Sequence, residues 1–240
     1  MTERDYEGLD VIVTGGAGAL GTAVVRLLVA RGAHCHVPAF DEGEAARFPL
    51  AGDPRVTVRT GIDLSDEVQV ERFYAQAPVP WASIHIAGGY AGGPLLDTTP
   101  TTARKLLSTN AMSAFLCSRE LVRRIRSGGS PDAPPPGGRI VNVSAKPALV
   151  PGAGVSAYAM SKAAVAALTL CLAEELKDER IWVNAVVPST MDTPANRAAM
   201  PSADHGAWPK VEDVASTIAF LASPENKSTR GALVPVYGRS

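Results

Sequence analysis

Tyr158 and Lys162, in the stretch Y-A-M-S-K, could together move a proton. Residues at this spacing lie on one face of a helix. An ammonium group next to a phenol stabilises the phenolate, so the pair predicts a tyrosine pKa below the usual value of about 10. Such a tyrosine is a usable acid or base. An exposed helix with an unrelated tyrosine and lysine would satisfy the same pattern.

A serine near this pair raises the question of whether it completes the site. The strand-like stretch V-N-V-S-A-K contains Ser144, which precedes Tyr158 by fourteen positions. Neighbouring side chains on a strand point to opposite faces. Two alternatives follow. Either a one-residue adjustment of the chain turns Ser144 towards Tyr158, or the site works without a serine.

A glycine-rich turn near the N-terminus predicts a dinucleotide-binding site. The stretch V-I-V-T-G-G-A-G-A-L-G reads as a strand, a turn and the start of a helix, with Gly16, Gly18 and Gly21 in the spacing G-x-G-x-x-G. Glycines let a pyrophosphate approach the helix N-terminus, where free N–H groups and the helix dipole bind it. The alternative is a purely structural turn. An NTPase phosphate loop is disfavoured because no Lys-Ser/Thr follows.

The second predicted strand leaves the choice between NAD and NADP open. An acidic residue at its end would bind the adenosine ribose 2′-hydroxyl. The stretch A-H-C-H-V-P-A-F-D has Ala39 at that position, Asp41 two places later, and no arginine beside it. His34 and His36 share one face of the strand, but no further metal ligands are in view. We therefore expect a structural role for both histidines and no metal site.

Strand and helix patterns alternate along the chain. Strands are predicted at 9–14, 34–40, 56–61, 81–87, 139–144, 181–187 and 232–236, and helices at 19–30, 65–77, 101–126, 157–177 and 211–222. Strands that are apolar throughout are typical of a parallel sheet covered on both faces. The fold class predicted is α/β, a single domain with a doubly wound parallel sheet of about seven strands.

Two segments interrupt this alternation. Residues 127–138 (S-G-G-S-P-D-A-P-P-P-G-G) are too rich in glycine and proline for a helix or strand, and we expect a mobile surface loop. Residues 188–209 are irregular and follow a strand, where substrate-covering loops occur in such folds.

Composition narrows the class of protein. The formal net charge is −1, from 23 basic and 24 acidic residues, which predicts neither nucleic acid nor a membrane as a partner. We expect no signal peptide and no segment long and apolar enough to span a bilayer. Cys35, Cys117 and Cys171 are far apart and odd in number, which predicts buried free thiols in a reducing cytoplasm.

Five features occur in order along the chain: the T-G turn at Thr14, Ala87–Gly88, Asn110, Y-x-x-x-K at Tyr158, and N-A-x-x-P at Asn184. Together they resemble the short-chain dehydrogenase/reductase superfamily over essentially the whole chain. The turn is a variant, with its glycines at Gly15, Gly18 and Gly21. The resemblance implies a Rossmann fold, an NAD(P)H cofactor, a small-molecule substrate, and a homodimer or homotetramer formed through the helices at 101–126 and 157–177.

The resemblance also implies roles for individual residues. Tyr158 would be the catalytic acid, Lys162 would lower its pKa and bind the nicotinamide ribose, and Asn110 would position a proton-relay water. Asp63 would contact adenine, and Thr193 the nicotinamide carboxamide. The implied cofactor-binding residues are Gly15, Gly18, Ala19, Leu20, Gly21, Asp63, Ala87, Gly88, Gly89, Tyr158, Lys162, Pro188, Ser189, Thr190, Met191 and Thr193.

Most members of the superfamily have a serine thirteen residues before the tyrosine, a position that Ala145 occupies here. The stretches G-G-A-G-A-L-G, A-G-G-Y-A-G-G, A-K-P-A-L and D-T-P-A-N-R-A-A-M-P resemble the dihydropteridine reductase branch, which also has alanine there. The chain departs from that branch in having Asn110 and in having Ala39 in place of the acidic residue. A quinonoid dihydropterin is electron-poor and needs less polarisation by a hydroxyl than a ketone does.

Three functions therefore remain open. The first is reduction of a planar, electron-poor substrate, against which the Tyr90 ring could stack. The second is a general carbonyl reductase or alcohol dehydrogenase that uses Ser144. The third is a dinucleotide-binding sensor or scaffold without turnover, against which the combination of Tyr158, Lys162 and Asn110 weighs.

Overall fold

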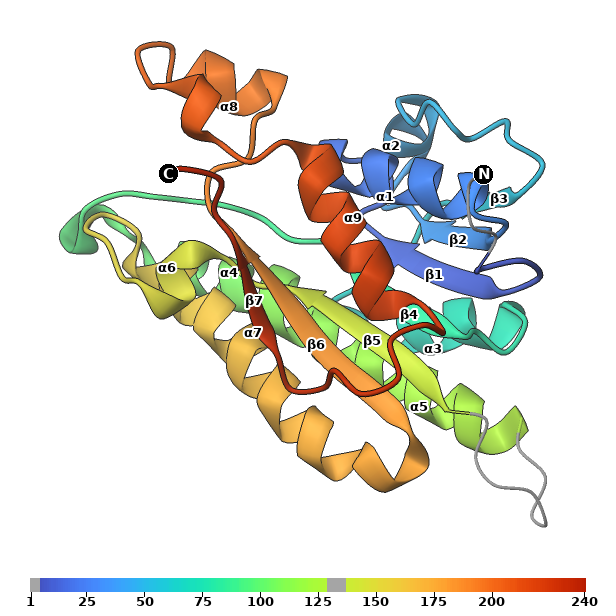
Figure 1. Ribbon diagram of the computed structural model, residues 1–240. Helices are drawn as coiled ribbons and strands as arrows, with labels where there is room; N and C mark the ends of the chain where they lie inside the picture. The colour runs from blue at the N-terminus through green and yellow to red at the C-terminus, as the bar shows by residue number, and fades with distance from the viewer. Residues whose placement is uncertain (1–4, 129–136) are drawn as a thin grey trace.

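The computed structural model describes residues 5–128 and 137–240. Its centre is a seven-stranded parallel sheet in the order β3-β2-β1-β4-β5-β6-β7 (Figure 1). The strands are β1 (Asp10–Thr14), β2 (His34–Pro38), β3 (Val56–Arg59), β4 (Ala82–His85), β5 (Gly138–Val143), β6 (Ile181–Pro188) and β7 (Leu233–Val236). The α-helices are α1 (Ala19–Ala30), α2 (Glu42–Ala46), α3 (Glu67–Gln76), α4 (Pro100–Leu106), α5 (Ser113–Gly128), α6 (Lys146–Leu149), α7 (Ser156–Glu175), α8 (Pro194–Ala199) and α9 (Val211–Ala222).

The strand order reverses between β1 and β4, which pair in parallel with Thr14 opposite His85. The connections from these two strands leave the sheet in opposite directions, so a crevice opens beyond their carboxyl ends. The glycine turn after β1 and the segment Ile86–Gly88 after β4 line that crevice. The topology therefore puts the predicted dinucleotide turn at the one edge where this fold binds ligands.

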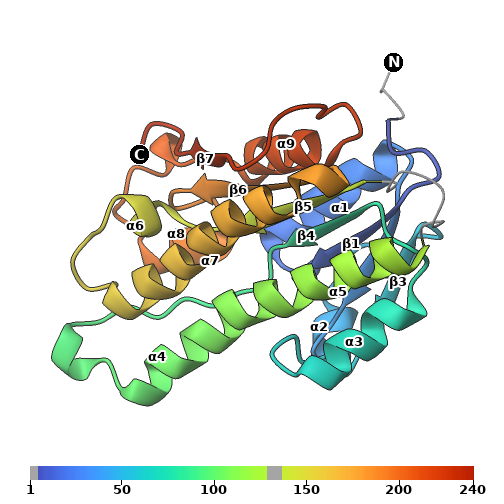
Figure 2. The same cartoon turned by 90° about the horizontal axis from the view of Figure 1, so that it is seen from below.

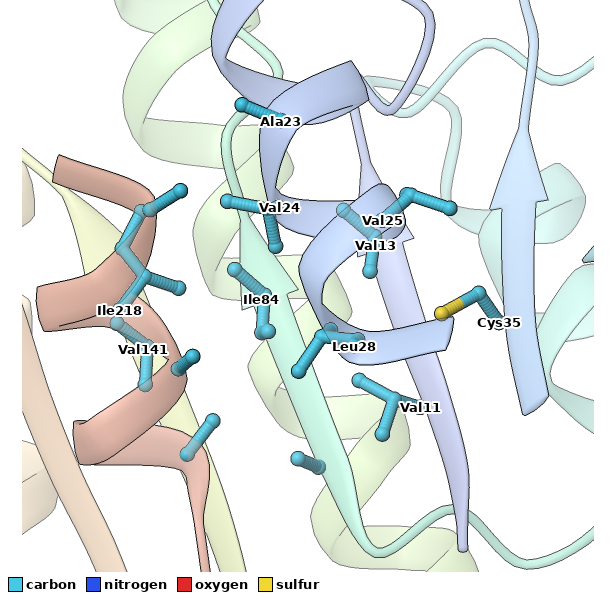
Figure 3. Close-up of a cluster of buried hydrophobic side chains, with 14 of the residues drawn as sticks. Val11, Val13, Ala23, Val24, Val25, Leu28, Cys35, Ile84, Val141 and Ile218 are labelled. Carbon is cyan, nitrogen blue, oxygen red and sulfur yellow. The ribbon is translucent and has the colours of Figure 1, made fainter. Parts of the chain in front are cut away.

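Helices cover both faces of the sheet, with α3, α5 and α7 on one face and α1 and α9 on the other (Figure 2). On the face covered by α1 and α9, Val11 and Val13 of β1 pack against Val24 and Leu28 of α1 (Figure 3). All four side chains are fully buried. Burial of each side chain contributes roughly 1.5–3 kcal/mol to folding. Ile12, between the two valines, packs in the same way on the opposite face.

The predicted helix at 101–126 is interrupted. A π-helical segment, η2 (Leu107–Met112), joins α4 to α5 and carries Asn110 into the interior. Such segments accommodate an extra residue within a helix and occur frequently at functional sites. Apolar periodicity alone cannot distinguish this segment from a continuous helix.

The predicted sheet and long helices are confirmed, and several smaller expectations are wrong. Residues 188–209 are not irregular throughout, because Thr193 caps α8 by accepting a hydrogen bond from the Asn196 N–H. Cys35 and Cys117 are buried, but Cys171 is exposed on α7. The predicted mobile loop at 127–138 falls mainly on residues 129–136, which lie outside the described residues.

The expectation that no segment is long and apolar enough to span a bilayer is also wrong. Within the described residues, α7 passes that test on length and composition. A core helix passes it too, and α7 packs along β5 and β6. Thr169 on this helix is fully buried and bonded to Asn142 of β5, as a core helix requires.

A buried chain of hydrogen bonds crosses the α3–α5–α7 face of the sheet. The Asn142 amide donates to Thr169 Oγ1 (2.9 Å), so its Oδ1 accepts from Nδ1–H of His85 (2.8 Å). His85 Nε2 then accepts from Ser83 Oγ (2.9 Å), which in turn accepts from the Tyr74 hydroxyl (2.7 Å). This pattern requires neutral His85, because a protonated Nε2 could not accept the hydrogen bond from Ser83 Oγ. Burial accordingly lowers the pKa of His85 from 6.5 to about 4.

This network predicts a specific loss of stability in mild acid. Between pH 6.5 and about 4 the unfolded chain protonates His85 while the folded protein does not. Neutral His85 therefore contributes fully to the free energy of unfolding above pH 6.5. As the pH falls from 6.5 towards 4, this free energy decreases by ~3 kcal/mol. Urea unfolding across this range should show a weaker pH dependence in His85→Gln than in the wild type. The exposed His34, changed to Gln, is the matched control, and equal slopes in both variants would contradict this account.

Candidate active site

A cleft of about 570 Å³ follows the carboxyl edge of the sheet across the point where the strand order reverses. Its walls come from the turn after β1, the ends of β2, β3 and β4, the segment η2–α5 and the start of the loop after β6. The lining residues are Gly15, Gly18, Ala19, Leu20, Gly21, Pro38, Phe40, Glu44, Ile62, Asp63, Leu64, Ser65, Ile86, Ala87, Gly88, Thr109, Ser113, Met191, Thr193 and Asn196.

Three glycines in the wall of the cleft are required by close backbone approach. Gly15 has φ +64°, and a Cβ there would lie 2.7 Å from the Ala87 nitrogen. A Cβ on Gly21 would lie 2.1 Å from the Gly15 oxygen, and one on Gly88 would lie 2.5 Å from Asn110 Oδ1. No side chain caps the first turn of α1. Its free N–H groups and the helix dipole therefore face a cradle suited to a pyrophosphate.

Asn110 holds the segment after β4 in place. Its Oδ1 accepts from the Gly89 N–H (2.8 Å), and its Nδ2 donates to the Gly89 carbonyl (3.0 Å) and to Ser161 Oγ (2.9 Å). The Ser161 hydroxyl donates to the Tyr158 carbonyl (2.8 Å). One buried carboxamide thus joins the glycine segment, the π-helical segment and the helix that carries Tyr158.

Lys162 is buried, behind the cleft wall that Gly88 forms. Its Nζ donates to the Val143 carbonyl at the end of β5 (2.9 Å) and would lie 3.3 Å from a Cβ on Gly88. Burial lowers the pKa of this ammonium group to about 8. No ion pair to Lys162 occurs among the residues that the structure describes, so the remaining N–H groups can bind hydroxyl groups of a ligand.

The prediction that Lys162 lowers the pKa of Tyr158 is wrong for the structure as it stands. Burial, with a smaller contribution from Tyr90, raises the pKa of the Tyr158 phenol to about 12. The ring of Tyr90 meets the Tyr158 ring edge-to-face at 5.0 Å. The ammonium group of Lys162 is instead bonded to the β5 backbone, so the helical spacing alone did not determine the pKa. At neutral pH Tyr158 is protonated.

Ser144 and Ala145 are both buried at the end of β5. Ser144 is 1% exposed, and its hydroxyl donates to the Lys162 carbonyl (2.8 Å). That bond holds α7 against the end of β5, and the hydroxyl proton is not available for a hydrogen bond to a substrate. Ala145, at the position expected for a serine, has no hydroxyl. The geometry thus favours a site in which neither residue polarises a substrate.

The end of the cleft next to β2 and α2 contains residues that sequence reasoning missed. Ala39 is buried at the end of β2, and the side chain of Asp41 accepts from the Glu44 N–H (2.7 Å). Glu44 Oε2 accepts in return from the Phe40 N–H (2.7 Å), and Glu44 and Phe40 both line the cleft. The spacing of Asp41 and Glu44 is a capping-box signal in the sequence. Asp63 also lines the cleft, and its contact with adenine stays a prediction.

Not all predicted cofactor residues reach the cleft wall. Gly89, Tyr158, Lys162, Pro188, Ser189 and Thr190 do not line the described cavity. The Ser189 hydroxyl donates to the Tyr237 carbonyl (2.9 Å), which directs it towards the C-terminal segment. Thr109, Ser113 and Asn196 line the cleft without having been predicted. The first two lie around the π-helical segment, whose extra residue no periodicity revealed.

Comparison with known proteins agrees with this geometry. The sequence model of the family described as short chain dehydrogenase matches residues 10–203. A short-chain type dehydrogenase/reductase of Picea abies is 30% identical, covering 96% of this chain and 92% of that protein. The cis-4-hydroxycyclohexanecarboxylate dehydrogenase of Sinomonas cyclohexanicum is 32% identical, covering 95% and 94%.

Solved structures share the fold. A short chain dehydrogenase/reductase family protein is 26% identical, with a TM-score of 0.87 over 98% of this chain and 97% of that one. ElxO with NADP bound is 22% identical, with a TM-score of 0.84 over 96% and 97%. With the family match spanning most of the chain, and both relatives covered almost end to end, the chain belongs to the short-chain dehydrogenase family of oxidoreductases.

Proposed function

We propose that the protein is an NAD(P)-dependent oxidoreductase in which Tyr158 is the proton donor. The observation that carries this proposal is the continuity of the glycine cradle with the Asn110–Ser161–Tyr158 connection. When bound, the nicotinamide supplies or accepts the hydride. The cradle fits a pyrophosphate-linked dinucleotide because Gly15, Gly21 and Gly88 all line the cleft, and their close packing leaves the N-terminus of α1 open to it.

The residues around Tyr158 suit proton transfer at neutral pH. A phenol with a pKa of about 12 is protonated and so can donate in the reductive direction. The buried Lys162, with a pKa of about 8, is mostly charged at pH 7. It is held close to Gly88, where its free N–H groups would bind the nicotinamide ribose. A charge brought closer to the phenol would favour phenolate formation after the proton leaves.

The substrate that this site suits best is a planar, electron-poor ring such as a quinonoid dihydropterin. Ala145 offers no hydroxyl, and Ser144 donates to the protein backbone. A substrate that readily accepts a hydride needs less polarisation than a ketone. The exposed Tyr90 ring lies against Tyr158 and offers a flat apolar surface for stacking. These features support the resemblance to the dihydropteridine reductase branch.

A second candidate is a dehydrogenase of hydroxylated substrates. The Sinomonas cyclohexanicum relative is a cis-4-hydroxycyclohexanecarboxylate dehydrogenase, which favours this candidate. In that reaction Ser144 would have to give up its bond to the Lys162 carbonyl, or another donor would have to bind the substrate oxygen.

The remaining features concern the surroundings of the site. We propose that the loop at 188–209, with α8 held by the Arg197–Asp192 ion pair, covers the substrate. Exposed apolar side chains on η2, α5 and α7, namely Met112, Phe115, Met160 and Leu170, support a homodimer or homotetramer formed through these helices. The protein would act in the cytoplasm on a small molecule.

Initial rates with NADH and NADPH test the proposal most broadly. The substrates should be a quinonoid dihydropterin and a small panel of ketones, aldehydes and secondary alcohols. Faster turnover of the dihydropterin supports the first candidate, and faster turnover of carbonyls or alcohols supports the second. Tight nucleotide binding without turnover of any of them would favour a non-catalytic sensor and contradict the proposal.

Tyr158→Phe should lower kcat by at least about a hundredfold, because it removes the proton donor and little else. NADH or NADPH affinity should stay within a few fold of the wild type, since the ring and its contact with Tyr90 are retained. Stopped-flow rates and nucleotide titration would measure both quantities. Wild-type turnover in Tyr158→Phe would remove this residue from the mechanism.

Ser144→Ala should leave kcat within a few fold of the wild type while lowering the free energy of unfolding by about 1 kcal/mol, the value of one buried hydrogen bond. Ala145→Ser is the complementary variant. It adds a hydroxyl at the position where the family usually has one, and should raise turnover of simple ketones by roughly tenfold or more. A large fall in kcat for Ser144→Ala would instead assign Ser144 to the substrate.

A further inference from the structure

The adenosine end of the cleft contains the features that decide which dinucleotide fits. A second cavity of about 340 Å³ adjoins the cleft there, and the two share Gly18, Phe40 and Glu44 in their walls. Asp41 and Arg47 complete the lining of this smaller cavity along with Ala17. Because Gly18 is the last residue before α1, this cavity lies beside the proposed pyrophosphate cradle.

Glu44 is fixed in this shared wall from two directions. Its backbone N–H donates to Asp41 Oδ1 (2.7 Å), and its Oε2 accepts from the Phe40 N–H (2.7 Å). No hydrogen bond to the other carboxylate oxygen, Oε1, occurs in residues 5–128 or 137–240. A carboxylate with one oxygen anchored and the other unengaged is suited to accept hydrogen bonds from ribose hydroxyls.

Ala39, at the end of β2, cannot take this role. Its side chain is 1% exposed, and its N–H and C=O are bonded to Arg59 and Ile62 of the neighbouring segment. Five positions later along the chain, α2 returns an acidic side chain to the same edge of the sheet. The acidic group that dinucleotide sites use for the ribose is therefore present, but on a helix instead of at the strand end.

A 2′-phosphate would meet an unfavourable environment at this position. The Phe40 N–H, which could otherwise donate to a phosphate oxygen, is occupied by Glu44. Glu44 and Asp41 place two carboxylates in the smaller cavity against the single guanidinium group of Arg47. Since like charges at short range repel, a phosphate dianion would have to displace Glu44 or bind next to it.

We propose that Glu44 binds the adenosine ribose hydroxyls and makes the protein selective for NAD(H) over NADP(H). This inference rests on the proposed function, because it concerns the cofactor of that same site. Arg47 is the feature that argues for the opposite selectivity, as a guanidinium group is the usual partner of a 2′-phosphate.

Equilibrium titration with NADH and with NADPH, followed by nicotinamide fluorescence, tests the proposal. The wild type should bind NADH at least about tenfold more tightly than NADPH, as expected for one charge-assisted hydrogen bond. Glu44→Gln should weaken NADH binding, leave NADPH binding equal or tighter, and so bring the two affinities within about threefold. Thermal unfolding would verify that each variant is folded.

Glu42→Gln is the matched control, since it removes the same charge from the same helix. The Glu42 carboxylate accepts from Thr60 Oγ1 (2.5 Å) and does not line either cavity, so the NADH-to-NADPH ratio should be that of the wild type. Arg47→Ala should not weaken NADPH binding more than it weakens NADH binding, because the proposal assigns no 2′-phosphate to Arg47.

Tighter binding of NADPH by the wild type, or equal ratios in Glu44→Gln and Glu42→Gln, would overturn the inference alone. Loss of NADPH affinity in Arg47→Ala would do the same and assign a 2′-phosphate to Arg47. If the folded wild type bound neither nucleotide, the proposed function would fail and this inference with it, so the two failures are distinguishable.

Discussion

The buried carboxamide of Asn110 is the interaction on which the rest of the site depends. Its three hydrogen bonds join the glycine segment after β4, the π-helical segment and, through Ser161, the backbone of Tyr158. Loss of the Asn110 side chain would leave the N–H and C=O groups of the half-buried Gly89 without their protein partners. The segment after β4 and the helix that carries Tyr158 are therefore held as one unit, and the π-helical segment brings the amide to this place.

The second constraint is close backbone approach. Because Gly21 lies against the Gly15 carbonyl, and Gly88 against Asn110, the turn after β1 and the segment after β4 pack closely and together line the cleft. Lys162 lies buried beside Gly88, and burial lowers the pKa of its ammonium group to about 8. Positive charge is thus stored in a buried position next to the space where a ligand's hydroxyl groups would lie.

Much of this could be predicted from the sequence, for a physical reason. Apolar strands, amphipathic helices and a glycine turn are local patterns, so the parallel sheet and the dinucleotide site followed from them. What failed depended on three-dimensional neighbours. The Lys162 ammonium group bonds to the β5 backbone instead of lowering the pKa of Tyr158, and Ser144 donates to the carbonyl of Lys162. Glu44 was missed because its helix returns to the sheet edge only in the folded chain.

The central claim is that a protonated phenol and a buried ammonium group act together on a bound nicotinamide. A crystal structure of the wild-type protein with NADH tests it most directly. The account predicts that the Tyr158 hydroxyl faces the C4 side of the nicotinamide ring and that Lys162 Nζ binds the nicotinamide ribose. A complex in which Tyr158 turns away from the ring, with Lys162 still bonded only to the Val143 carbonyl, would contradict it.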